Sequence, residues 1–201
     1  MVHSHGPRIR TSWSRPAHPP RQWRARPMIL GSYMDNRMVK TFAEGKVGAI
    51  AMAVEFGPGR RCHEFNIDIG RVVDGKWRST PIRAQSWVFE TMTYGGMTTM
   101  VPGEFSVMSV SCKVGNNATT LNGPYAKFQV RLGEVANLGV LRLDNKTEGV
   151  FVVTGKLKKS IAGMKPEMRA KMKEEFPGMF PKAVDRHMTM VGPTEVDIKK
   201  R

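Results

Sequence analysis

Hydrophobic residues at every second position constrain this chain more than any other feature of its sequence. Between Glu64 and Ile69, apolar and polar residues alternate strictly, and the same alternation returns between Tyr125 and Leu132. A period of two is that of a β-strand with one dry face and one wet face. The pattern predicts an antiparallel all-β domain over residues 47–155.

The first strand of this domain, within residues 47–56, is expected to lie in the interior of a sheet. Larger apolar residues alternate there with alanines: Ile50, Met52, Val54 and Phe56 against Ala49, Ala51 and Ala53. Both faces of such a strand are apolar, so both need cover from other parts of the chain.

Clusters of glycine, proline and asparagine divide the domain into about eight short strands. We interpret as turns, loops or strand ends Asp74-Gly75, Gly95-Gly96, Pro102-Gly103, Gly115-Asn116-Asn117, Asn122-Gly123-Pro124 and Asp144-Asn145-Lys146. One strand is expected at Trp87–Thr93, ended by the glycine pair. Short strands with frequent turns predict a β-sandwich or small barrel. The spacing of a βαβ unit does not occur, which argues against a parallel nucleotide-binding sheet.

Residues 1–46 are predicted to form a disordered basic arm. They carry nine Lys or Arg and two Asp or Glu, a net charge of +7 out of +15 for the whole chain, together with five prolines. Such a segment buries too little apolar surface to offset the entropy lost on ordering. Its Arg-rich composition is also that of a transit peptide, and a start codon placed upstream of the natural one would add a similar segment.

Residues 156–201 are predicted to form a helical segment and a tail that pack on the sheet. Pro166 suits the first turn of a helix, and Met168, Met172 and Phe176 recur every four residues on one helix face. Pro177-Gly178 is expected to end the helix. The Met and Phe stripe is expected to face the sheet, with a ligand groove or a partner surface as the alternative.

The two cysteines, Cys62 and Cys112, both fall in or beside predicted strands. In an oxidising compartment they can form a cross-strand disulfide, and in a reducing one they can remain buried thiols.

No catalytic, cofactor or metal site is recognisable in the sequence. A Gly-x-Ser-x-Gly elbow, a Cys-x-x-Cys pair and a His-x-x-x-His pair are all missing. We therefore expect no cofactor and favour a protein that is not an enzyme. The candidate anion-binding residues are the arginines of a glycine-rich loop and of the basic arm, Arg60, Arg61, Arg21, Arg24 and Arg26.

No run of apolar residues reaches the length of a transmembrane helix, and no signal-peptide core is recognisable. We therefore expect no transmembrane segment.

Two segments carry a resemblance to known proteins. Val101-Pro102-Gly103-Glu104-Phe105-Ser106-Val107 and Gly133–Leu141 resemble a loosely defined set of uncharacterised bacterial envelope proteins, exported or lipidated, and Pro166–Met188 is similar to the tail of such proteins. The resemblance implies an exported β domain without enzymatic activity, in the periplasm or outer envelope. It implies no catalytic residues.

Two functions follow as expectations. The first is a noncatalytic binding or structural β domain of the bacterial cell envelope. The alternative is a basic anion-binding module, whose partner is nucleic acid or an acidic polymer.

Overall fold

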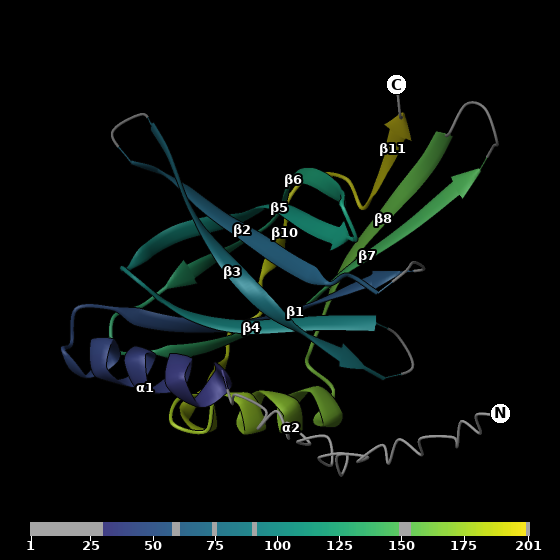
Figure 1. Ribbon diagram of the computed structural model, residues 1–201. Coiled ribbons are helices and arrows are strands. Elements are labelled where there is room, and N and C mark those ends of the chain that lie inside the picture. Colours follow the sequence, from purple (N-terminus) through teal and green to yellow (C-terminus); the bar gives the residue numbers. More distant parts are fainter. Residues whose placement is uncertain (1–29, 58–60, 74–75, 90–91, 149–153, 200–201) are drawn as a thin grey trace, which may run out of the picture.

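The computed structural model describes residues 30–57, 61–73, 76–89, 92–148 and 154–199 (Figure 1). The helices are α1 (Leu30–Ala43) and α2 (Pro166–Glu175), followed by the 3₁₀ turn η1 (Phe180–Lys182). The strands are β1 (Gly48–Gly57), β2 (Glu64–Val73), β3 (Lys76–Val88), β4 (Met92–Met100), β5 (Gly103–Val114), β6 (Asn117–Val130), β7 (Val135–Glu148), β8 (Thr154–Ala162), β9 (Val184–Asp185), β10 (Thr189–Met190) and β11 (Glu195–Lys199).

The strands follow one another in the order β10-β6-β5-β2-β3-β4-β1-β7-β8-β11, with β9 beside β7. β3 takes part in two sheets: its first part pairs with β2 and its last four residues pair with β4. The prediction of a mostly β chain is confirmed, and the described strands do not close into a barrel.

Not every pairing is antiparallel, which corrects the sequence prediction. β1 lies parallel to β7, and β9 also lies parallel to β7. A parallel pair needs a long crossover, and five strands of intervening chain provide it between β1 and β7. β1 thus lies between two neighbours, as its two apolar faces indicate, and Ala49–Val54 have no exposed surface.

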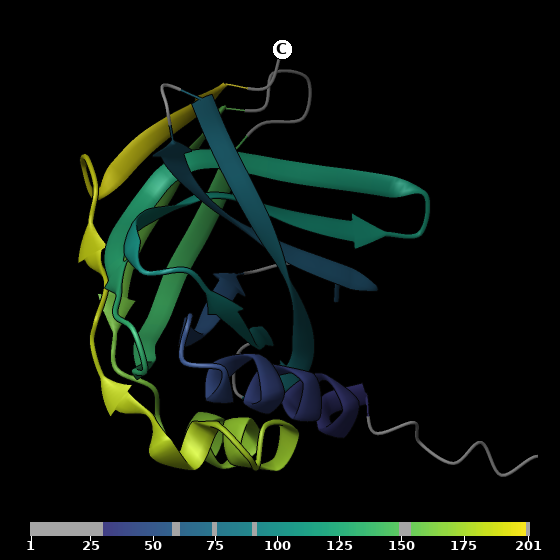
Figure 2. The same ribbon diagram turned by 90° about the vertical axis from the view of Figure 1, so that its left-hand side faces the viewer.

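The curved sheet wraps around one core cluster, which Phe65, Ile67 and Tyr94 help to form (Figure 2). A second cluster lies on the opposite face of β1, where the alanines of that strand allow α1 and α2 to approach closely. The two helices lie side by side against the sheet in both views (Figures 1 and 2). Met168 and Met172 of α2 are buried in this second cluster.

The predicted boundaries at residues 46 and 155 are both corrected. Residues 30–43 form α1, whereas the sequence predicted disorder over 1–46; residues 1–29 lie outside the described chain. Met38 is buried against the second cluster, and the Asp35 carboxylate accepts a hydrogen bond from the Gly178 amide. These tertiary contacts stabilise a helix that has little intrinsic signal.

The C-terminal part also contributes strands as well as helix. β8 runs to Ala162, and β9, β10 and β11 add to β7, β6 and β8 in turn. Residues 191–194 connect two distant strands, because Val191 donates a hydrogen bond to Tyr125 of β6 and Thr194 accepts one from Lys159 of β8.

Candidate functional site

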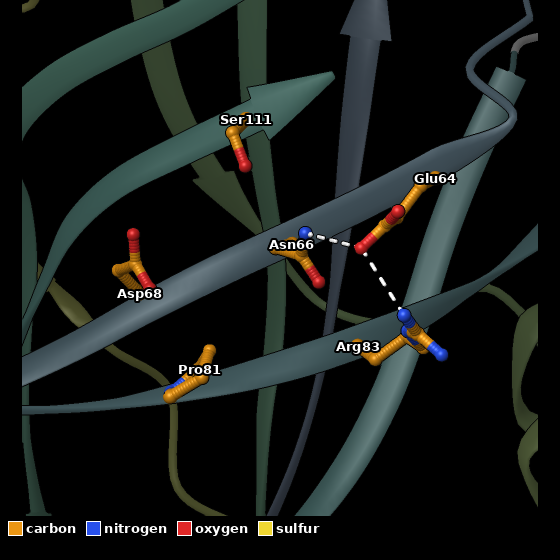
Figure 3. Close-up of a pocket in the computed structure, with 6 residues that line it drawn as sticks. All are labelled: Glu64, Asn66, Asp68, Pro81, Arg83 and Ser111. Carbon is orange, nitrogen blue, oxygen red and sulfur yellow. Dashed lines mark hydrogen bonds and ion pairs between the residues drawn. The ribbon is translucent and has the colours of Figure 1, made fainter. Parts of the chain in front are cut away.

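One shallow depression lies on the outer face of β2, β3 and β5 (Figure 3). Its lining residues are Glu64, Asn66, Asp68, Pro81, Arg83 and Ser111. They lie on the face opposite Phe65 and Ile67, because successive side chains of a strand point to opposite sides.

The carboxylates of this depression already accept hydrogen bonds from neighbouring side chains. Glu64 accepts hydrogen bonds from Asn66 and from Arg83, both at 3.2 Å. These two bonds, with the charge of Arg83, hold the pKa of the Glu64 carboxyl below its usual value. Asp68 accepts a 2.7 Å bond from the Ser109 hydroxyl. The carboxylates are therefore already partnered, and the surface is that of an ordinary wet sheet face.

A second pocket, of about 330 Å³, differs in its charge balance. It lies where the β2–β3 hairpin, the end of β4, the start of β5 and the end of α1 come together. Its described lining residues include two arginines and no carboxylate; they are Thr41, Val47, Arg71, Arg78, Thr80, Thr99, Met100, Val101 and Phe105. We call it the arginine pocket.

The two arginines of the pocket face each other across the hairpin. Arg71 of β2 pairs directly with Arg78 of β3. Directly opposed residues of an antiparallel pair have Cβ atoms about 5 Å apart, so like charges there repel. Both also continue the inward-facing positions of their strands, since Arg71 follows Ile69 and Arg78 precedes Thr80 and Ile82 at spacings of two. The guanidinium groups of Arg71 and Arg78 therefore lie at the edge of the hydrophobic core.

Arg71 is held in place by neutral groups. Its Nη1 donates to the Pro102 carbonyl at 3.3 Å, and its guanidinium carbon lies 5.1 Å from the centroid of the Phe105 ring. A guanidinium has five N–H donors, so most of them remain for another partner. Gly103 leaves room for this arrangement, because a Cβ there would lie 3.1 Å from Nη1.

Arg78 is exposed and makes no hydrogen bond or ion pair with any residue that the structure describes. An arginine pair with hydroxyls nearby, and with no carboxylate among the lining residues that the structure describes, has the chemical character of an anion site. Thr80 and Thr99 supply those hydroxyls, whereas the Thr41 hydroxyl donates to the Arg37 carbonyl at 3.0 Å.

Of the arginines selected from the sequence, Arg61 alone falls within the described residues. It is exposed, its Nε donates to the Ser86 hydroxyl at 3.1 Å, and it does not line the arginine pocket. Arg60, Arg21, Arg24 and Arg26 lie outside the described residues.

Of the two cysteine states that the sequence left open, the structure has the disulfide. Cys62, just before β2, is bonded to Cys112 of β5, with their Cα atoms 5.3 Å apart. The bond ties the start of β2 to its neighbour β5, close to the pairing of Phe65 with Cys112.

The described chain contains neither a helix that could cross a membrane nor a cluster of metal ligands. Its helices are all too short or too polar to cross a membrane. Its His, Cys, Asp and Glu side chains nowhere gather in a group of three that would hold a metal ion.

The arginine pocket was missed because its signal is a pairing rather than a motif. A predicted two-residue turn at Asp74-Gly75 requires Val73 to pair with Lys76 and therefore Arg71 with Arg78, and β2 and β3 make both pairs. The predicted hairpin thus implied opposed arginines, and the alternation of β2 implied that they point inward.

No protein-family model and no curated protein matches this chain. Among solved structures, it shows a weak similarity to a leucine-rich repeat protein from Bacteroides thetaiotaomicron, with a TM-score of 0.38 and 7% sequence identity. The match covers 49% of this chain and 14% of that protein.

Proposed function

We propose that this protein is a noncatalytic binding domain whose ligand is an anion, held in the arginine pocket. The observation that carries the proposal is the direct opposition of Arg71 and Arg78 in a pocket with no carboxylate among its described lining residues. An anion between the two guanidinium groups would replace their mutual repulsion with charge-assisted hydrogen bonds.

The residue types of the pocket favour binding over catalysis. Its lining offers guanidinium groups, hydroxyls and apolar side chains, whereas acid–base chemistry calls for His, Asp, Glu, Lys, Tyr or Cys at the reacting group. The retained donors of Arg71, and Arg78 with no partner in the described part of the chain, suit recognition of a planar or tetrahedral oxyanion.

The test is an NMR titration of the full-length protein with acetate and with inorganic phosphate at low ionic strength, following the arginine Nε–Hε resonances. Two charge-assisted hydrogen bonds give a dissociation constant of about 1 mM. We expect saturable shifts for Arg71 and Arg78, and binding at least about tenfold weaker in Arg78→Gln.

Arg83→Gln is the matched control, because Arg83 is an exposed arginine of the same strand on the opposite face. It should leave binding unchanged. Arg78→Glu places a carboxylate opposite Arg71, so it should fold normally and lose anion binding. Shifts that do not saturate, or that are equal in R78Q and R83Q, would refute the proposal.

The bacterial envelope remains our proposal for the location, on the resemblance of residues 101–107 and 133–141 to envelope proteins. A disulfide is typical of proteins that fold in an oxidising compartment, which supports it. Alkylation of cysteines in fractionated cells tests it: Cys62 and Cys112 should be protected until reduction, in the envelope fraction.

A further inference from the structure

The lining of the arginine pocket contains two chemical kinds of side chain. The polar ones are Arg71, Arg78, Thr41, Thr80 and Thr99. The apolar ones, which we call the apolar wall, are Val47, Met100, Val101 and Phe105, and Arg71 lies over the ring of Phe105. The apolar wall adds nothing to the binding of an inorganic anion, because apolar groups offer an ion no hydrogen bonds.

The apolar wall belongs partly to the core and partly to the surface. Met100 and Phe105 are buried members of the inner cluster, whereas the Val101 side chain is 46% exposed at the pocket. An apolar group placed against Val101 would remove its surface from water, which is favourable in proportion to the area covered.

The dimensions of the pocket limit the ligand to a small molecule. Its volume of about 330 Å³ is at the lower end of the range for small-molecule sites. Side chains from α1, the segment before β1, β2, β3, β4 and β5 surround it. An extended polymer calls instead for a long basic groove that follows its backbone.

We infer that the ligand is a small amphipathic anion: a compact monoanionic head, such as a carboxylate, joined to a short apolar body. The head lies between Arg71 and Arg78 and accepts their remaining N–H groups. The body lies against Val47, Val101 and Phe105. This inference rests on the proposed function and names the class of ligand for the same pocket.

Three probes separate the contribution of head and body. Hexanoate has both, acetate has the head alone, and hexanol has a body of the same length without charge. Each methylene that becomes buried strengthens binding about fourfold. Titration calorimetry on the full-length protein should therefore show hexanoate binding at least about tenfold tighter than acetate and at least about tenfold tighter than hexanol.

Variants of the apolar wall provide the second readout. Val101→Thr keeps the shape of the side chain and replaces a methyl group by a hydroxyl, so it should weaken hexanoate binding about two- to fourfold and leave acetate binding unchanged. Val184→Thr is the matched control, because Val184 is 45% exposed at a position away from the pocket. It should change neither affinity.

The outcomes distinguish the two proposals. Equal affinities for hexanoate and acetate, both reduced in R78Q, would overturn the amphipathic ligand and keep the anion site. Equal affinities for hexanoate and hexanol would overturn the anionic head. Failure of acetate, phosphate and hexanoate to bind would overturn the inference together with the proposed function.

Discussion

At the scale of single residues, two buried tyrosines differ in whether their hydroxyl is satisfied. Tyr94 stacks on Phe65 with ring centroids 4.1 Å apart, and its hydroxyl accepts a 2.9 Å hydrogen bond from the Cys62 amide. The Tyr125 hydroxyl is buried with no hydrogen-bond partner among the described residues. Lys159 lies 5.8 Å from the centroid of the Tyr125 ring, a contact that needs the ring and not the hydroxyl.

Removing the two hydroxyls should therefore have opposite consequences. Tyr94→Phe leaves a buried amide without its acceptor and should lower the free energy of unfolding by about 1–2 kcal/mol. Tyr125→Phe removes an unsatisfied group, keeps the ring and should be neutral or stabilising at pH 7. Urea unfolding of both variants measures this. A loss of stability in Y125F as large as in Y94F would contradict it.

The buried hydroxyl of Tyr125 also predicts that the stability of the fold depends on pH. Burial raises the pKa of Tyr125 from 10.0 to about 12 in the folded protein. The folded state therefore holds this proton more tightly than the unfolded state, so the corresponding stability is complete below pH 10 and is lost as the pH rises towards 12. Y125F should escape this loss, and its advantage over the unmodified protein should grow above pH 10.

At the scale of elements, β4 shows that a glycine pair can either end a strand or make room for neighbouring side chains within one. Gly95 and Gly96 were predicted to end a strand, but they lie in the middle of β4, where Gly95 pairs with both Ala53 and Gln85. A Cβ at Gly95 would overlap the Trp87 ring, and one at Gly96 would lie 2.6 Å from a methyl of Ile82. The glycines leave space for side chains of β3, which no local pattern reveals.

Gly95→Ala should consequently displace the Trp87 ring and destabilise the fold by about 1–3 kcal/mol through overpacking. Gly163→Ala is the control, since a Cβ there would meet only His187, at ordinary contact distances of 3.6 and 3.7 Å. Thermal unfolding of both variants provides the measurement. A G95A protein as stable as G163A would show that the ring can move without cost.

Two other clusters of turn-forming residues were wrongly predicted to interrupt strands, for related reasons. Asn122-Gly123-Pro124, predicted to lie at a loop, falls within β6 at a register shift against β5, between the pairs Val107–Ala126 and Ser109–Asn122. β7 continues through Asp144-Asn145-Lys146, which pairs with β8. Local turn chemistry predicted the Pro102-Gly103 connection correctly, because it depends only on neighbours in sequence. The predicted turn at Asp74-Gly75 lies outside the described residues.

At the scale of the whole molecule, alternation predicted which faces are buried but not which strands are neighbours. Phe65, Phe128 and Val130 are all in the core, as their period of two indicates. The parallel pairing of β1 with β7 and the successive pairing of β9, β10 and β11 with three different strands depend on contacts distant in sequence. The arginine pocket has the same origin, since its walls come from residues 41 to 105.

The disulfide acts at this largest scale, because it restricts the unfolded chain rather than one strand. Cys62 and Cys112 are 50 residues apart, and the loop between them contains β2, β3, β4 and most of β5. Closing a loop of this length lowers the entropy of the unfolded state by an amount worth about 4 kcal/mol at 25 °C.

The double variant Cys62→Ala/Cys112→Ala should therefore unfold with a free energy reduced by about 2–4 kcal/mol, and with a larger urea m-value because the uncrosslinked chain is more expanded. Reduced, unmodified protein should reproduce both changes, which separates the effect of the bond from that of the smaller side chains. A double variant within about 1 kcal/mol of the oxidised protein would mean that the bond does not limit the unfolded chain.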